Sequence, residues 1–227
     1  MSNNEVMPKE HFHGSDLEKI EARYGISKDE IVQFGANVNP LGLSDRLKAS
    51  LGEHLDVITG YPDREYTALR ETIAEYCGCD KDHILVGNGS TELISLCIQS
   101  LSPRKAVVIS PAYSEYEHEL MICESRVTYY QLKEEDSFQL DLDDFLRALG
   151  NDIDMCIICN PNNPTSTSIC HEQMLPILKH CHQNNIFVMI DETYVEFTEN
   201  YEEVTAVPFT NDFTNLIVLR GISKFFA

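Results

Sequence analysis

The last stretch of the chain places a lysine just after an apolar segment. Leu216–Leu219 has the composition of a buried strand, and Lys224 follows it between a serine and two phenylalanines. A lysine amine at the mouth of such a strand can serve as a nucleophile toward an aldehyde. The same pattern also fits an ordinary solvated lysine, so the polar groups at the other strand ends must distinguish the two interpretations.

A motif further upstream, Gly89-Ser90-Thr91, could hold a phosphate. It follows an apolar segment and opens a predicted helix, so it offers backbone N–H groups, two hydroxyls and the positive end of the helix dipole. The alternative is a simple helix N-cap. The chain carries 37 acidic and 17 basic residues, a formal charge of −20, so an anionic ligand would need a local cradle of this kind.

Other predicted strand ends carry polar or aromatic side chains. Asp191 ends an apolar run, where a carboxylate needs a partner such as an ion pair, a helix N-cap or a cationic ligand. Asn163 and Tyr194 add an amide and a phenol, and Tyr113 adds a flat aromatic face. Together with Lys224 and the phosphate motif, they match the needs of pyridoxal 5′-phosphate, which has a phosphate, an aromatic ring, a pyridine nitrogen, a phenolic oxygen and an aldehyde.

These side chains require elements that bring the strand ends together. From residue 84 onward, short apolar segments alternate with longer amphipathic ones, which is the pattern of parallel strands separated by helices. Strands are predicted over 84–86, 106–109, 127–131, 153–159, 186–190 and 216–219, with helices over 90–101, 114–124, 141–149 and 171–184 between them. We therefore predict an α/β fold of three layers, α/β/α, with a mostly parallel sheet and a ligand site at the carboxyl ends of its strands.

The chain before residue 84 is predicted to be less regular. Its expected elements are an arm over 1–14, a helix between Ser15 and Gly25, a strand over 31–34, a helix capped by Ser44 and a helix over 67–76. The loop 35–42 is rich in turn formers and amides, which fits either a plain connection or a lip facing a ligand. We divide the chain into residues 1–43, comprising the arm, first helix and lip, and a cofactor-binding domain over 44–227.

Composition argues against several classes of partner. The acidic residues are spread through the chain, which disfavours nucleic acid and anionic membranes as partners. Neither a signal peptide nor an apolar run long enough to span a membrane is recognisable, so a cytoplasmic location is expected. The eight cysteines lack a recognised zinc spacing, and those in apolar segments are expected to be small core residues, so we predict no metal site.

The order of these motifs resembles the fold-type I pyridoxal 5′-phosphate-dependent aminotransferases of class I and II. The resemblance rests on Asn160-Pro161-Asn162-Asn163-Pro164-Thr165, Asp191-Glu192-Thr193-Tyr194 and Ser223-Lys224 in this order, and it runs from about Gly14 to Ala227. Within that superfamily, the chain is similar to the histidinol-phosphate aminotransferases and to their relatives, the threonine-phosphate decarboxylases.

The resemblance implies a role for each candidate residue. Lys224 would form an aldimine with the cofactor and shuttle a proton at the substrate carbon. The catalytic set would be Lys224, Asp191 and Tyr194. Asp191 would pair with the pyridine nitrogen, Asn163 and Tyr194 would hydrogen-bond the ring oxygen, and Tyr113 would stack on the ring. The phosphate would be held by Gly89, Ser90, Thr91 and Ser223, and by Tyr61 from the partner subunit of a homodimer. Asn37 and Asn39 would form the lip over the substrate.

The implied reaction is amino transfer between an amino acid, of the histidinol-phosphate kind, and a 2-oxo acid. The alternative is decarboxylation of a phosphorylated amino acid, as in the threonine-phosphate decarboxylases, because both reactions use the same cofactor residues. A third hypothesis is a non-catalytic ligand-binding domain. The presence of Lys224, Asp191, Asn163 and Tyr194 together argues against it, because a binding domain has no need for all four.

The chain departs from the family pattern at two points. Relatives commonly have a serine or threonine three residues before the lysine, where this chain has Gly221, so Ser223 would serve alone there. The chain also ends three residues after Lys224, whereas relatives continue through further arginines and a small C-terminal domain. We therefore expect it to be a portion of a longer protein that lacks the small domain.

Overall fold

The computed structural model describes residues 17–32 and 35–227. The predicted arm over 1–14, the Ser15 cap and the second half of the predicted strand 31–34 lie outside these residues. Residues 31 and 32 are not part of a strand.

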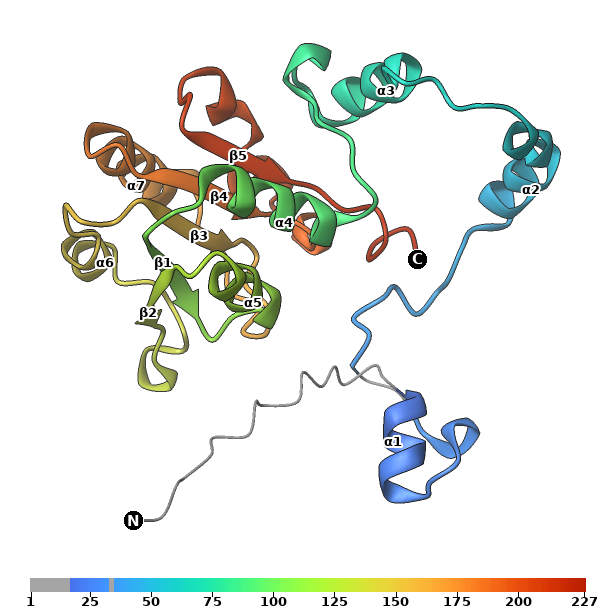
Figure 1. Ribbon diagram of the computed structural model, residues 1–227, viewed down its shortest axis with the longest axis horizontal. Helices are drawn as coiled ribbons and strands as arrows, with labels where there is room; N and C mark the ends of the chain where they lie inside the picture. The colour runs from blue at the N-terminus through green and yellow to red at the C-terminus, as the bar shows by residue number, and fades with distance from the viewer. Residues whose placement is uncertain (1–16, 33–34) are drawn as a thin grey trace.

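A five-stranded sheet forms the centre of the molecule, with the strand order β2-β1-β3-β4-β5 (Figure 1). Its strands are β1 (Lys105–Ser110), β2 (Arg126–Gln131), β3 (Met155–Cys159), β4 (Phe187–Asp191) and β5 (Leu216–Leu219). All four pairings are parallel, and Asp191 lies opposite both Cys159 and Leu219 in register. The carboxyl ends of β3, β4 and β5 therefore meet at one edge of the sheet.

Helices cover both faces of this sheet. Alternate residues of β3 point to opposite sides: Cys156 and Ile158 join one core cluster, whereas Met155 and Ile157 join the other. The first cluster includes residues of α6 (Leu142–Ala148) and α7 (His171–Gln183), and the second includes residues of α4 (Ser90–Leu101) and α5 (Ser114–Ile122). The predicted three-layer α/β/α architecture is therefore confirmed.

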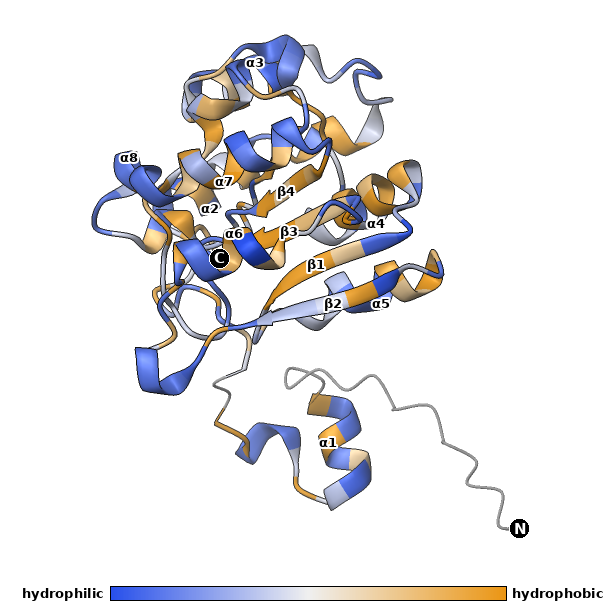
Figure 2. Ribbon diagram, turned by 90° about the vertical axis from the view of Figure 1, so that its left-hand side faces the viewer, coloured by the Kyte–Doolittle hydropathy of each residue, from blue (hydrophilic) through white to orange (hydrophobic). Residues whose placement is uncertain are grey.

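Burial on both faces explains the apolar runs seen in the sequence. Every residue of β3 is buried, and β1, β3 and β4 are coloured as hydrophobic over most of their lengths (Figure 2). The edge strand β2 is paler in the same view because its residues are less hydrophobic, and several of its side chains are exposed.

The predicted strand over 84–86 is wrong. Residues 84–87 follow the short 3-10 helix η3 (Lys81–His83) and have no regular secondary structure. A strand needs a neighbouring strand that pairs with its backbone N–H and C=O groups, and among the described residues no strand pairs with 84–87. A cavity of about 720 Å³ is lined both by residues 84–87 and by β5. The segment is also not fully buried, since Leu85 is exposed and Ile84 and Val86 are only half-buried, so the apolar pattern predicted neither the pairing nor the burial of a core strand.

The N-terminal elements lie at the periphery of the molecule. They are α1 (Leu17–Tyr24), η1 (Lys28–Glu30), α2 (Asp45–Glu53), η2 (Leu55–Thr59) and α3 (Thr67–Cys77). The Ser44 hydroxyl accepts a hydrogen bond from the Leu47 N–H at 3.2 Å, which confirms the predicted cap of α2. Figure 1 shows α1 and α2 away from the sheet, and Figure 2 again shows α1 apart from it.

The rest of the chain after β2 contains short connecting elements. These are η4 (Glu134–Asp136), η5 (Val195–Phe197), α8 (Tyr201–Val204) and η6 (Val207–Asn211). The segment from η5 to α8 follows β4 directly, so it lies close to the carboxyl edge of the sheet.

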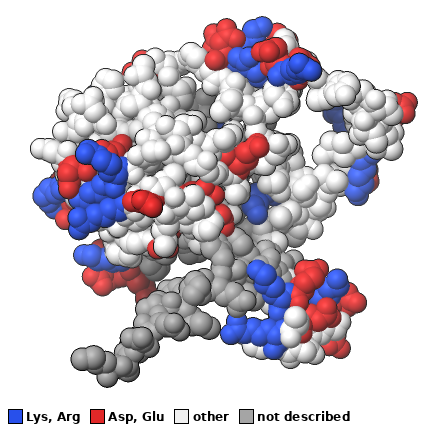
Figure 3. Space-filling view, in the orientation of Figure 1, with Lys and Arg blue, Asp and Glu red and all other residues white. Residues whose placement is uncertain are grey.

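Surface and cysteine features complete the description. On the face shown in Figure 3, basic side chains occur in small groups with acidic side chains beside them. All eight cysteines are free. Cys156 and Cys159 are buried, as expected for cysteines in an apolar segment, and Cys181 of α7 is buried as well. Within the described residues, no cluster of His, Cys, Asp or Glu could hold a metal ion, and no helix has the length and apolarity to cross a membrane.

Candidate active site

Asp191, the last residue of β4, is a buried acidic group at the carboxyl edge of the sheet, with 4% of its surface exposed. Its Oδ2 accepts a hydrogen bond from the Tyr116 hydroxyl at 2.6 Å, and its Oδ1 accepts from the Thr193 N–H at 2.9 Å and the Thr193 hydroxyl at 2.6 Å. None of the ion pairs within residues 17–32 and 35–227 includes Asp191. A buried carboxylate held only by neutral donors has room for a cationic partner, such as a protonated ring nitrogen.

Lys224 lies in the turn that follows β5. Its half-buried amine donates a hydrogen bond to the Ala36 carbonyl at 3.0 Å and forms no ion pair with another described residue. The Asn39 N–H donates to the Lys224 carbonyl at 2.8 Å, and the Asn39 amide donates to the Phe225 carbonyl at 2.9 Å. The loop 35–42 therefore contacts the lysine turn directly, and the amine is not neutralised by a carboxylate there.

Tyr194 and Asn163 line one cavity of about 840 Å³ together with Asn37. Burial raises the pKa of Tyr194, while a hydrogen bond with the Asn37 side chain opposes that rise. The phenol therefore stays protonated near neutral pH and can donate a hydrogen bond. Asn37 has a φ of +50°, in the left-handed region that asparagine tolerates better than most residues. The cavity thus joins the predicted lip to two predicted cofactor residues.

Tyr113 immediately precedes α5 and lies between the phosphate motif and Asp191. Its hydroxyl hydrogen-bonds the Thr91 side chain, and burial raises its pKa. Its ring packs edge-to-face on Tyr116, with centroids 5.7 Å apart, and Tyr116 is the donor to Asp191. The predicted aromatic face and the predicted phosphate motif are therefore linked to the buried carboxylate.

The start of α4 and the lysine turn line a common cavity. Gly89, with a φ of +84° that favours glycine, precedes α4 at its N-cap, and both Gly89 and Ser90 line the cavity of about 720 Å³. Gly221 and Ser223 line the same cavity from the other side. The first turn of α4 also contains Glu92, whose carboxylate accepts a hydrogen bond from the Asn88 N–H. The N–H groups and hydroxyls of this region suit a phosphate.

Two predicted residues occupy different settings from the rest. Tyr61 is 99% exposed, on the segment between η2 and α3, and contributes nothing to the site of its own chain. Asn39 has both polar side-chain atoms engaged, since its Oδ1 also accepts from the Leu41 N–H at 3.0 Å. Asn37 is therefore the better placed of the two predicted lip residues to meet a substrate.

Sequence reasoning missed the groups that hold the predicted ones in place. Tyr116 and Thr193 bind Asp191, and the Ala36 carbonyl binds Lys224. Thr193 carried a signal, because it directly follows the buried Asp191-Glu192 pair. Tyr116 carried none, since a tyrosine within a helix after a predicted strand end is an ordinary core residue.

The assembled groups fit pyridoxal 5′-phosphate. The site supplies a buried carboxylate without a described cationic partner, an unneutralised amine, a protonated phenol beside an amide, an aromatic face, and a helix N-terminus with hydroxyls. Each of these matches one part of the cofactor.

Comparison with known proteins gives a consistent picture. The family described as aminotransferase class I and II matches residues 29–227. The threonine-phosphate decarboxylase of Salmonella typhimurium is 34% identical over 215 residues, which are 95% of this chain and 58% of that protein. The chain thus spans little more than half the length of this curated relative.

Solved structures share the fold. The histidinol-phosphate aminotransferase from Clostridium acetobutylicum is 30% identical, with a TM-score of 0.76 over 86% of this chain and 57% of that one. The histidinol-phosphate aminotransferase from Sinorhizobium meliloti, solved in complex with pyridoxal 5′-phosphate, has a TM-score of 0.81 at 18% identity, over 99% of this chain and 60% of that one.

Proposed function

Because this chain belongs to the family of class I and II aminotransferases, whose members depend on pyridoxal 5′-phosphate, we propose that it is the cofactor-binding part of an enzyme acting on a small amino acid. The observation that carries the proposal is the buried Asp191 at the carboxyl edge of the sheet. It accepts hydrogen bonds from neutral donors but has no cationic partner among the described residues, and Lys224 lies in the turn after the neighbouring strand β5. A non-catalytic domain would have no reason to keep such a buried acidic group without a cationic partner.

The positions of the side chains support the proposed roles. Bound pyridoxal 5′-phosphate supplies an electron sink for the electrons of a bond broken at the substrate's α-carbon. Asp191 holds the ring nitrogen in its protonated form, and Tyr113 offers its ring as a stacking surface. Tyr194 and Asn163 donate hydrogen bonds to the phenolic oxygen.

The remaining residues bind the phosphate and move the proton. Gly89, Ser90 and Thr91 provide backbone N–H groups and hydroxyls at the start of α4, and Ser223 faces the same cavity from the lysine turn. Lys224 would hold the cofactor through its amine and would serve as the acid or base that moves a proton at the substrate's α-carbon.

The first candidate reaction is amino transfer between an amino acid and a 2-oxo acid. It is supported by the family as a whole and by the structural similarity to a histidinol-phosphate aminotransferase. In this reaction, the Lys224 amine would act as the base that removes the α-proton of the substrate and as the acid that gives a proton back. Asn37, on the lip that contacts Tyr194, is the proposed substrate contact within this chain.

The second candidate is decarboxylation of a phosphorylated amino acid. It is favoured by the 34% identity to a threonine-phosphate decarboxylase over 95% of this chain. The two reactions would differ in which bond of the substrate's α-carbon is broken, while the same residues of this chain would hold the cofactor.

One experiment separates the two reactions. The full-length protein is given threonine phosphate or histidinol phosphate, each with 2-oxoglutarate and pyridoxal 5′-phosphate, and both carbon dioxide and glutamate are measured. Glutamate formation supports amino transfer, and carbon dioxide without glutamate supports decarboxylation.

A second experiment tests the shared proposal itself. With added pyridoxal 5′-phosphate, the wild-type protein should show a visible absorbance band that changes with pH, and Lys224→Ala should lose it. Lys133→Ala, which removes an exposed lysine outside the site, should retain the band. No band in the wild-type protein would overturn the enzyme proposal and favour a non-catalytic domain.

We also propose that the functional unit is a homodimer in which Tyr61 reaches the partner's phosphate site. The full exposure of Tyr61 supports this, as do the exposed side chains of Leu55, Val57 and Ile58 on η2. Tyr61→Ala and Lys224→Ala subunits, each weak in binding the cofactor covalently, should regain tight binding when mixed, because a mixed dimer rebuilds one intact site. Mixing without any gain would argue against the shared site.

A further inference from the structure

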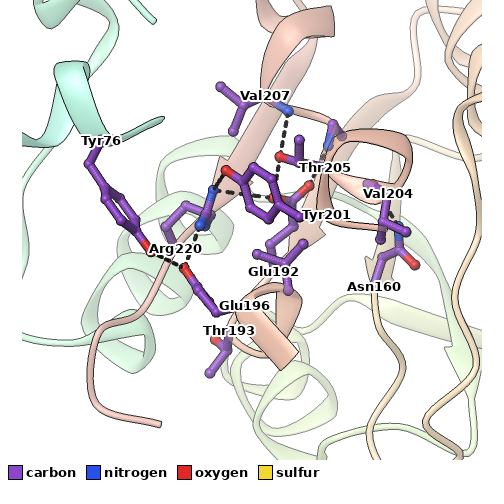
Figure 4. A network of polar contacts seen from close by, with 12 residues as sticks. Tyr76, Asn160, Glu192, Thr193, Glu196, Tyr201, Val204, Thr205, Val207 and Arg220 are labelled. Atoms are coloured by element: carbon purple, nitrogen blue, oxygen red, sulfur yellow. Dashed lines mark hydrogen bonds and ion pairs between the residues drawn. The ribbon is translucent and has the colours of Figure 1, made fainter. Parts of the chain in front are cut away.

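Arg220, the first residue after β5, lies at the centre of a buried polar network that the proposed chemistry does not use (Figure 4). Its side chain is 13% exposed. One terminal nitrogen donates to the Tyr201 hydroxyl at 2.9 Å and lies 3.7 Å from the Glu192 carboxylate, and the other forms a short ion pair with Glu196. These partners all come from the segment that follows Asp191.

The guanidinium is also enclosed by aromatic rings. Its central carbon lies 5.8 Å from the ring centroid of Tyr76 in α3 and 5.4 Å from that of Tyr201. The Tyr76 hydroxyl donates to Glu196 at 3.2 Å. Burial disfavours the charge of Arg220, but hydrogen bonds to Tyr201 and Glu196 and the nearby carboxylates outweigh it and raise its pKa, so Arg220 remains charged. Arg220 therefore joins the end of β5 to α3 and to the segment from η5 to α8.

The other end of the lysine turn contacts the same two elements. The ring of Phe226 packs edge-to-face on Tyr76, with centroids 6.1 Å apart, and the ring of Phe225 packs on Phe197 of η5 at 5.1 Å. The Phe226 N–H donates to the Ile222 carbonyl at 3.1 Å and closes the turn. Residues before and after Lys224 are thus both fixed against α3 and η5.

We propose that Arg220, acting with Glu196 and Tyr76, is a positioning residue that sets where the Lys224 amine lies relative to Asp191. This inference rests on the proposed function of Lys224. Gly221, Ile222 and Ser223 cannot do this themselves, since Ile222 and Ser223 are exposed and Gly221 has no side chain. Besides the hydrogen bonds that Ala36 and Asn39 form with Lys224 and Phe225, the turn is therefore held by the contacts of its two ends.

The network has a feature that suits a positioning role better than a purely stabilising one. The Arg220 Nε and Glu196 Oε2 atoms are buried, and neither has a hydrogen-bond partner in the described part of the chain. Replacing such an incompletely satisfied ionic cluster with apolar side chains often costs little stability. Removing Arg220 alone leaves the Glu192 and Glu196 carboxylates buried without their cation and costs stability too, so the positioning role is tested by the geometry of the turn in variants that still fold.

The test measures how fast Lys224 captures pyridoxal 5′-phosphate in the full-length protein. Covalent capture is followed by absorbance and confirmed by borohydride reduction and mass spectrometry of the modified lysine. A misplacement of about 1 Å can slow a reaction by up to about 100-fold, so Arg220→Met should slow capture about 10-fold or more. Arg147→Met is the matched control, because it removes a surface arginine paired with Asp144 at 3.1 Å.

Two further variants separate positioning from folding. Arg220→Lys keeps the charge without the planar fork and should recover part of the capture rate. Glu196→Gln should slow capture as well, and the double variant with Arg220→Met should be no slower than Arg220→Met alone, because both act through one contact. Thermal unfolding and near-ultraviolet circular dichroism show that each variant is folded.

The outcomes are distinct. Capture by folded Arg220→Met within twofold of the wild-type rate would overturn the positioning role. If Arg220→Met does not fold, Glu196→Gln decides, and a wild-type capture rate in that variant would likewise overturn it. Failure of the wild-type protein to capture the cofactor at Lys224 would instead overturn the proposed function.

Discussion

Replacing Glu192 by glutamine should remove a large part of the pH dependence of stability. Glu192 is fully buried beside Asp191, where its carboxylate accepts hydrogen bonds from the Ala206 N–H and from the Thr205 hydroxyl at 2.8 Å. Burial raises its pKa to about 7 from an ordinary 4.5, even though those donors and Arg220 favour the charged form. The folded protein therefore binds this proton more tightly than the unfolded chain does.

The sign and size of the effect follow from those two pKa values. Below about pH 4.5 the carboxyl is protonated in both states and its full contribution to stability is present; as the pH rises through about 7 that contribution is lost. One pKa unit corresponds to about 1.4 kcal/mol, so the wild-type protein should lose about 2.5 kcal/mol through this group between about pH 5 and 8.

The assay is urea unfolding of the full-length protein at several pH values, with the free energy of unfolding extrapolated to water. The glutamine of Glu192→Gln cannot ionise. Between pH 5 and 8, the free energy of unfolding of this variant should therefore fall by about 2.5 kcal/mol less than that of the wild-type protein. Glu202→Gln, which changes an exposed glutamate nearby, should follow the wild-type curve. Parallel curves for Glu192→Gln and the wild-type protein would refute the reasoning.

Three further predictions concern the site. Gly221→Ser should fold normally, because a Cβ there would lie 3.5 Å from the Thr193 hydroxyl, which is an ordinary contact. The added hydroxyl should lower the dissociation constant for pyridoxal 5′-phosphate severalfold, as measured by equilibrium dialysis. Weaker binding would contradict this prediction. Asp191→Ala should lose most turnover while still binding some cofactor, and wild-type turnover would show that Asp191 does not pair with the ring nitrogen. Asn39→Ala removes two side-chain hydrogen bonds, one donated to the Phe225 carbonyl and one accepted from the Leu41 N–H. It should lower the free energy of unfolding by about 1 to 2 kcal/mol in urea unfolding, with no change counting against these contacts.

Much of the central fold could be predicted from the sequence because its strands are apolar on both faces. β5 and α4 have the predicted bounds, and β1, β3 and β4 differ by one or two residues. The failure at residues 84–86 has a simple cause. Apolar composition reports that a segment prefers burial, whereas a strand also needs a neighbour for its backbone hydrogen bonds, and composition carries no information about that neighbour.

For the candidate site, the sequence suggests residues where a single residue type fits a single chemical need. Asp191, Tyr113 and Tyr194 lie near one another because parallel strands deliver their carboxyl ends to one edge, and their roles toward a cofactor stay predictions. The groups that orient them could not be predicted in the same way. Arg220 contacts residues of α3, the segment after β4 and α8, and no local pattern around Arg220 indicates which distant carboxylate or ring it will meet.

The contacts of the lysine turn also determine when the site can form during folding. Lys224 and Ala36 are 188 positions apart in the chain, and Tyr76 and Glu196 are 120 apart. Contacts that close such long loops carry a large entropic cost and form after local ones. A refolding chain should therefore recover its helix and strand signal before it can bind pyridoxal 5′-phosphate covalently. Covalent binding at Lys224 should follow the contact between the loop 35–42 and the lysine turn.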